Sequence, residues 1–109
     1  MPPVLAPLAF THGTRAGMRA QASCVIQEGD PPLKMRWEKD GKSLESQKNG
    51  IWISQLDPSS SILVIKKASA RHSGNYTCSV TNPAKTTSTT TELIVRGMKI
   101  NISTTRRSF

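Results

Sequence analysis

Two cysteines, Cys24 and Cys78, flank a tryptophan, Trp37, and a tyrosine, Tyr76, stands two positions before the second cysteine. Around these residues apolar and polar side chains alternate, which is typical of half-buried strands. A sandwich of two antiparallel sheets places such cysteines on facing strands and packs the tryptophan against them. The combination therefore predicts an all-β chain whose core lies between two sheets.

The two cysteines admit two interpretations. In an intracellular protein a lone pair is more often two free thiols than a bridge. Here the positions of Trp37 and Tyr76 favour a structural disulfide between Cys24 and Cys78. Such a bridge closes a loop of about 54 residues and contributes about 4 kcal/mol by restricting the unfolded chain. An oxidising, extracellular setting is therefore expected.

The order of these four residues is that of an immunoglobulin sandwich. Alternation and turn residues predict strands at 2–10, 18–26, 33–38, 61–66 and 76–80, a strand that 51–53 open before the turn at Asp57, and a last strand that ends at Leu93 and Val95. In the usual lettering, strands A, B, E and D form one sheet and strands C, F and G the other. A short, weakly specified strand is expected after the turn at Asp40-Gly41. One domain is expected over 2–96, with 97–109 as a tail or remnant.

Charge and termini limit the classes of partner and location. The chain carries 15 Lys and Arg against 7 Asp and Glu, a formal charge of +8, which taken alone suggests a polyanion. Four basic residues follow the last expected strand, so the chain up to the end of that strand at Val95 carries +4, which is typical of a solvated surface. The chain shows neither a signal peptide nor an apolar run long enough to span a membrane. We expect a piece of a larger secreted or membrane-anchored protein.

Several stretches resemble a known family. Leu63-x-Ile65 followed by Gly74-x-Tyr76-x-Cys78 resembles the intermediate-set immunoglobulin domains of cell adhesion receptors. Two further stretches are similar to Dscam-type proteins: Ala6-Pro7-Leu8-Ala9-Phe10 and Arg71-His72-Ser73-Gly74-Asn75-Tyr76-Thr77-Cys78, together with the opening Gly17-Met18-Arg19. The resemblance is greatest to the variable seventh immunoglobulin domain of insect Dscam and the first domain of the shortened Dscam proteins of chelicerates. It covers about residues 2–96.

This resemblance implies a recognition domain that binds an identical copy of itself on an opposing cell, with isoform diversity setting specificity. It also implies an extracellular location at the cell surface, within a single-pass membrane receptor. His72 stands where most immunoglobulin domains carry an aspartate that pairs with an arginine, and Lys48-Asn49-Gly50 stands where that arginine is expected. The usual ion pair is therefore not expected.

The two outward faces differ in composition. The outward residues of strands C and F are polar, as on a solvated face: Lys34, Arg36, Glu38, Thr77, Ser79 and Thr81. On strands B, E and D, by contrast, the alternation places Val25, Ile62, Val64 and Trp52 outward. These four predict one apolar patch, which an isolated monomer does not normally display. The alternative is that β-branched residues only favour strands and that Trp52 is covered or belongs to the core.

We interpret the patch as a homophilic contact with Trp52 as its aromatic anchor. Two copies meeting through one patch form a two-fold dimer, here antiparallel and of micromolar affinity, about −8 kcal/mol. The predicted interface consists of Arg19, Gln21, Ser23, Val25, Trp52, Ser54, Ile62, Val64 and Lys66.

Two tripeptides, Asn75-Tyr76-Thr77 and Asn101-Ile102-Ser103, fit the pattern of N-glycosylation acceptors, with coincidence as the alternative. A glycan at Asn75 lies on strand F, away from the predicted contact.

Other functions have weaker support. The chain has two isolated histidines and no carboxylate pair or phosphate loop at catalytic spacing, so we expect no enzyme, cofactor or metal site. A heparan-like polyanion is the main alternative partner, through Arg15, Arg19, Lys34, Arg36, Lys66, Lys67 and the tail. These residues scatter over both sheets, and no aromatic platform for nucleic acid accompanies them. A different receptor binding the same patch is a third possibility.

Overall fold

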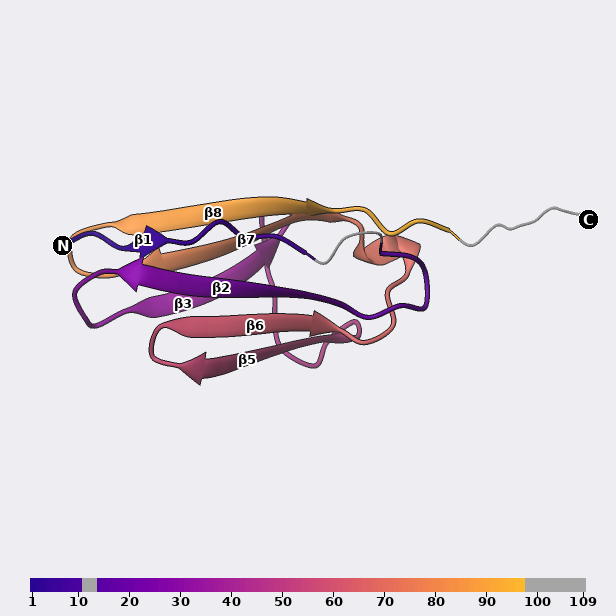
Figure 1. Ribbon diagram of the computed structural model, residues 1–109, viewed down its shortest axis with the longest axis horizontal. Helices are drawn as coiled ribbons and strands as arrows, with labels where there is room; N and C mark the ends of the chain where they lie inside the picture. Colours follow the sequence, from indigo (N-terminus) through magenta and orange to yellow (C-terminus); the bar gives the residue numbers. More distant parts are fainter. Residues whose placement is uncertain (11–13, 98–109) are drawn as a thin grey trace, which may run out of the picture.

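In the part of the chain that the structure describes, residues 1–10 and 14–97 of a computed structural model, eight strands form two facing sheets (Figure 1). Both sheets are antiparallel, with the orders β1-β2-β6-β5 and β4-β3-β7-β8. The elements are β1 Val4–Leu5, β2 Ala20–Glu28, β3 Lys34–Lys39, β4 Lys42–Ser43, β5 Ile51–Asp57, β6 Ser60–Ile65, the 3₁₀ turn η1 Ala70–His72, β7 Gly74–Thr81 and β8 Thr86–Leu93. The predicted immunoglobulin-like sandwich is confirmed.

The first expected strand is shorter than predicted. In place of the single strand predicted over 2–10, this segment forms the two-residue strand β1 and an isolated bridge between Phe10 and Ala22. Prolines at positions 2, 3 and 7 explain the difference, because a proline has no backbone N–H to give to a neighbouring strand.

The second sheet has one strand more than the three predicted. The two-residue β4 pairs with the end of β3, through Glu38 with Ser43 and Lys39 with Lys42. Asp40 and Gly41 between them have φ of 50° and 82°, the two positive values of a type I′ hairpin turn. The Asp-Gly turn is therefore as predicted, and the strand after it is short, as expected.

The disulfide and the tryptophan tie the two sheets together. Cys24 on β2 and Cys78 on β7 are bridged across the core, and both are almost fully buried. Trp37 on β3 lies beside Cys78 in the sheet register. Its indole N–H donates a hydrogen bond of 2.9 Å to the hydroxyl of Ser61 on the opposite sheet. The two sheets are therefore held together by one covalent and one polar contact across the core.

Tyr76 packs in the core and connects it to η1 and to Phe10. Its hydroxyl donates a 2.6 Å hydrogen bond to the backbone carbonyl of His72, and its ring meets Phe10 edge to face at 5.0 Å. Burial raises the pKa of the Tyr76 phenol well above its ordinary value, so the hydroxyl stays a donor at neutral pH.

Candidate interaction surface

The outer face of β2, β6 and β5 is built from rows of residues that the sheet register places side by side. Gln21, Val64 and Trp52 form one row, and Ser23, Ile62 and Ser54 form the next. Ile51, which neighbours Trp52, is buried in the core. Because successive strand residues point to opposite faces, Trp52 lies on the outer face, where the sequence placed it.

Trp52 is covered by a cation rather than by strand β1. The ammonium of Lys66 lies 4.5 Å from the centre of the indole ring, within the range of a cation–π contact. At the edge of the same surface, Arg19 donates a 3.1 Å hydrogen bond to the side chain of Gln21. Both predicted flanking cations therefore lie beside the apolar rows.

Val64 is not part of the exposed apolar patch, which corrects the prediction for this residue. Its side chain is on the outer face but retains only 9% of its accessible surface. Gln21 and Trp52 stand directly on either side of it in the sheet and cover it. Val25 remains 39% exposed, and Ile62 and Trp52 are half-buried, so these three carry the apolar character of the face.

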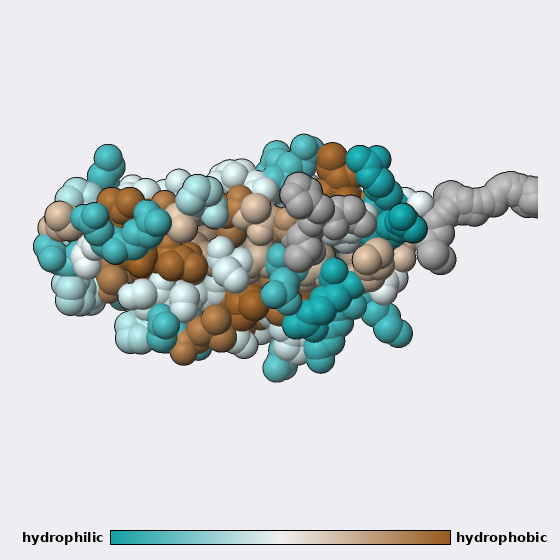
Figure 2. Space-filling model, in the orientation of Figure 1, coloured by the Kyte–Doolittle hydropathy of each residue, from teal (hydrophilic) through white to brown (hydrophobic). Residues whose placement is uncertain are grey.

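Two exposed apolar residues extend this face and were missed by the sequence prediction. Leu56, next to the bulge in β5, is 63% exposed, and Val4 on β1 is 43% exposed. Alternation from Trp52 through Ser54 points to Leu56, so a signal for it was present in the sequence. Val4 lies beside the end of β2, a pairing that only the folded chain shows. In Figure 2 hydrophobic surface gathers over β1 and β2 and again along β6.

The face carries opposite charges at its two ends. At one end, where Ala20 pairs with Ile65, Arg19 precedes the first residue of β2 and Lys66 follows the last residue of β6. Asp57 ends β5 at the other, where it pairs with Ser60 and accepts hydrogen bonds from the Ser59 N–H and the Ser60 hydroxyl. Within the described residues Asp57 makes no ion pair, so its charge is available to a partner.

The outer face of the other sheet is polar along its whole length. Hydroxyl pairs join β7 to β8, from Thr77 to Thr90 at 2.8 Å, Ser79 to Ser88 at 2.8 Å and Thr81 to Thr86 at 2.9 Å. Asn75 is exposed on the same face. Hydroxyl groups already paired within the sheet offer a partner little apolar area to bury.

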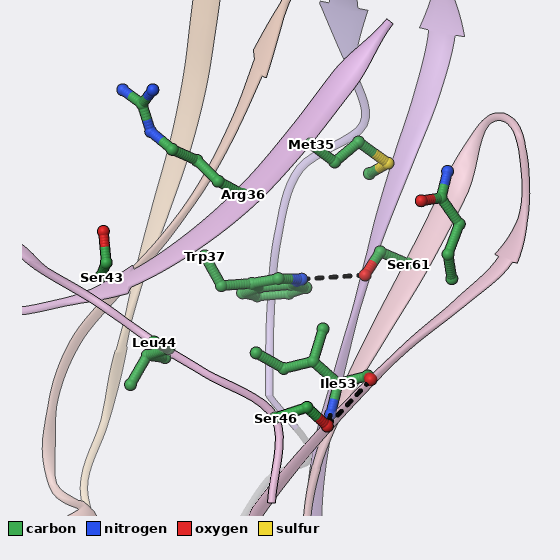
Figure 3. A pocket seen from close by; sticks show the side chains of 9 residues that line it. Met35, Arg36, Trp37, Ser43, Leu44, Ser46, Ile53 and Ser61 are labelled. Carbon is green, nitrogen blue, oxygen red and sulfur yellow. Dashed lines mark hydrogen bonds between the residues drawn. The ribbon is translucent and has the colours of Figure 1, made fainter. Parts of the chain in front are cut away.

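A cavity of about 260 Å³ opens between β3 and β5, where the edge strands β4 and β5 do not pair (Figure 3). The Trp37 indole, Leu44 and Ile53 line it, together with the Ser46 hydroxyl, which accepts from the Ile53 N–H at 2.9 Å. Arg36 is its only charged lining residue. No histidine or carboxylate lines the cavity to activate its serine hydroxyls, so it offers no pair of nucleophile and base.

Within the described residues no group of three or more His, Cys, Asp or Glu side chains is placed to hold a metal ion. No helix in the same part of the chain is long and apolar enough to cross a membrane.

Sequence comparison gives a consistent set of relatives. Residues 2–82 match the immunoglobulin domain family. The chain is 46% identical over 84 residues to the cell adhesion molecule Dscam2 of Drosophila melanogaster, which covers 77% of this chain and 4% of that protein. It is 38% identical over 96 residues to the cell adhesion molecule DSCAML1 of Homo sapiens, which covers 88% of this chain and 4% of that protein. The chain thus spans a small fraction of these relatives.

Solved structures show the same fold. A crystal structure of the Dscam1 Ig7 domain, isoform 9, matches with a TM-score of 0.83 at 35% identity and covers 87% of this chain and 100% of that chain. The titin I-band fragment I67–I69 matches with a TM-score of 0.76 at 27% identity, and the match covers 88% of this chain and 33% of that chain.

Proposed function

Because this chain belongs to the immunoglobulin domain family, as a domain of the Dscam type, we propose that it is an extracellular adhesion domain that binds a second copy of itself. The family is non-enzymatic, and the matched relatives are cell adhesion molecules, which places the domain at or outside the cell surface. The contact runs through the outer face of β1, β2, β6 and β5. The observation that carries this proposal is that the face joins exposed apolar residues to complementary charges at opposite ends.

The charges fit an antiparallel two-fold dimer. A two-fold axis that lies in the contact plane, parallel to the sheet and across β6 at Leu63, between the rows of Ile62 and Val64, stacks the two faces and exchanges the two ends of β6. Residue Lys66 lies three positions after Leu63 and Ser60 lies three positions before it. Lys66 of one copy therefore faces the Ser60 and Asp57 end of the second copy, and the reverse contact follows by symmetry. A parallel arrangement brings like charges together, which costs affinity.

The apolar residues supply the centre of this contact. Val25 and Leu56 are exposed apolar groups that a second copy can cover. The half-buried Ile62 and the Trp52 indole, with Lys66 over its ring, lie beside them. We expect micromolar affinity for this contact, about −8 kcal/mol. Adhesion then depends on many receptors gathered at a cell contact, where avidity amplifies weak pairs. Exchange of one charge at the ends discriminates between isoforms.

The first experiment is sedimentation equilibrium of the full chain across concentration. Val25→Asp buries a charge in the contact and is expected to weaken the dimer at least tenfold, which corresponds to about 1.4 kcal/mol. Thr90→Asp makes the same type of exchange at an exposed strand residue on the other sheet and is expected to leave the dimer unchanged. Circular dichroism establishes that both variants are folded. A wild-type chain that stays monomeric at high micromolar concentration contradicts self-association of this domain.

A charge exchange tests the antiparallel alignment. Lys66→Glu and Asp57→Lys are each expected to weaken self-association, because each places like charges opposite one another. The double variant Lys66→Glu/Asp57→Lys restores opposite charges and is expected to recover affinity for itself. Failure of the double variant to recover, with a wild-type dimer present, rejects this alignment and retains self-association.

A different receptor bound by the same face is the second candidate, and the exposed apolar groups suit it equally. This candidate predicts that the wild-type chain is a monomer that binds to cells. It also predicts that Val25→Asp abolishes this binding and that Thr90→Asp retains it.

A further inference from the structure

The fold gathers basic residues that the sequence separates. Three segments meet at the end of the domain where β6 leads into η1, and backbone hydrogen bonds join them. The Ala16 N–H donates to the Arg96 carbonyl at 2.9 Å, and the Gly17 N–H donates to the Ala68 carbonyl at 2.7 Å. Arg15 and Arg96 form a parallel bridge. We call the exposed basic residues of these segments the basic pole: Arg15, Arg19, Lys66, Lys67, Arg71 and Arg96.

The basic pole has no carboxylate to balance it. None of its six side chains makes an ion pair with another described residue. The sequence holds no Asp or Glu between Pro58 and Thr91, which includes the whole of β6, η1 and β7. In Figure 2 strongly hydrophilic surface gathers at this end of the molecule. Like charges held close together without counter-charges repel one another, and a multivalent anion relieves that repulsion.

From this arrangement we propose that the basic pole is a binding site for a sulfated polysaccharide. The site differs from the homophilic face, because Arg15, Lys67, Arg71 and Arg96 lie outside the rows of β2, β6 and β5, and only Arg19 and Lys66 border both surfaces. Guanidinium groups suit sulfate as they suit phosphate, through paired N–H donors. Exposed Met18 and Ile94 stand among these segments and offer apolar contact to a sugar ring.

Sulfated polysaccharide fits this surface better than nucleic acid does. Nucleic-acid platforms interleave cations with exposed aromatic rings on which bases stack. Among the described residues, the one aromatic ring in contact with a side chain of the basic pole is Trp52, and Lys66 already lies over it. The extracellular location of the family also makes sulfated glycans the polyanion that this domain meets.

Two triple variants with the same loss of charge test the proposal. Arg15→Gln/Lys67→Gln/Arg71→Gln removes three charges from the basic pole. Lys34→Gln/Arg36→Gln/Lys85→Gln removes three exposed charges that lie elsewhere on the domain. Binding of a heparin-derived oligosaccharide to the full chain is measured by calorimetry from 0.05 to 0.3 M salt, on the order of the ionic strengths at which such binding changes steeply.

We expect the pole variant to lose at least tenfold in affinity and its salt slope to fall by about 2, while the control variant loses less than twofold. Equal losses in the two variants, or no binding by the wild type at about 0.15 M salt, overturn the site. Equally tight binding of single-stranded DNA overturns the assignment to a sulfated glycan. Dimerisation of the pole variant stays as in the wild type, so failure of this proposal is distinguishable from failure of self-association.

Discussion

At the scale of single residues, His72 replaces an ion pair by two neutral hydrogen bonds. Its Nδ1 accepts the Ser69 backbone N–H at 2.9 Å, and its Nε2–H donates to the Asn49 carbonyl at 2.7 Å. The expected absence of the aspartate–arginine pair agrees with the contacts of the described residues, where Lys48 pairs with Glu45 instead. His72 therefore joins η1 to the loop before β5 without burying a charge.

Replacement of His72 is expected to destabilise the domain. His72→Ala removes both hydrogen bonds, deprives the partly buried Asn49 carbonyl and Ser69 N–H of this partner and leaves a hole where the imidazole was buried, at a cost of about 2 kcal/mol in the free energy of unfolding. Denaturant titration measures this loss. Asn49→Gly is the control: it keeps the carbonyl that His72 contacts and tolerates the positive φ of 56° at that position, so its cost is expected to stay below about 1 kcal/mol. Equal costs contradict a role for the imidazole.

Asn75 is predicted to carry an N-linked glycan. Its side chain is exposed, while Tyr76 in the same tripeptide is buried and fixes the outward direction of its neighbours. In secretory expression, peptide-N-glycosidase treatment is expected to lower the mass of the chain, and Asn75→Gln is expected to remove that part of the shift. Asn101→Gln identifies the part of the mass shift that comes from the second acceptor, which lies outside the described residues. An unmodified Asn75 in the purified chain rejects the prediction.

At the scale of elements, the turn between β3 and β4 is held against the start of β7 by one carboxylate. Asp40 Oδ1 accepts the Asn75 N–H at 2.9 Å, and the Asn75 carbonyl accepts the Asp40 N–H at 2.8 Å. A Cβ on Gly74 would lie 2.6 Å from Asp40 Oδ2, so only glycine permits this approach. The Asn75 N–H, and secondarily the Lys39 ammonium at 3.2 Å, lower the pKa of Asp40.

This lowered pKa gives a defined pH dependence. A carboxyl group whose pKa is lower in the folded than in the unfolded chain stabilises the fold above its unfolded pKa, and the contribution disappears as pH falls through the folded value, below about pH 4. Asp40→Asn is therefore expected to be less stable than the wild type at pH 7 and to approach it near pH 2.5, in denaturant titrations at both pH values. Glu28→Gln, which removes one exposed charge elsewhere, is the control and is expected to show no such convergence.

Prediction of the elements from the sequence succeeded where alternation was strict. The core residues of β2, β6 and β7 follow directly from period two, and the Asp-Gly turn follows from its residues. β8 is different, because its residues before Leu93 are Thr86 to Glu92 and contain no large apolar side chain. Pairing with the preceding strand β7, including the three hydroxyl pairs, supports this stretch as a strand, and neither the pairing nor the hydroxyl contacts can be read from an apolar alternation within β8.

At the scale of the whole molecule, stability depends on the single bridge between the sheets. Cys24→Ala/Cys78→Ala is expected to lower the free energy of unfolding by about 4 kcal/mol, because the unfolded chain regains the freedom of a loop of 54 residues. Denaturant titration measures the change, and the reduced wild type is expected to give a similar midpoint. A loss below about 1 kcal/mol contradicts the chain-entropy account for this domain.

Sequence patterns were enough for the sandwich, the pairing of Cys24 with Cys78 and the inward residues of β2, β6 and β7, because each depends on local periodicity or on the chemistry of a few residue types. They left open whether Trp52 points outward or into the core. The tertiary structure alone decided which side chains stand next to one another. It covered Val64 with its neighbours, added Leu56 and Val4 to the outer face, and gathered Arg15, Lys67 and Arg71 at one pole. Such neighbourhoods arise from strand pairing and segment docking between residues far apart in the chain, and a one-dimensional pattern does not encode the distances between them.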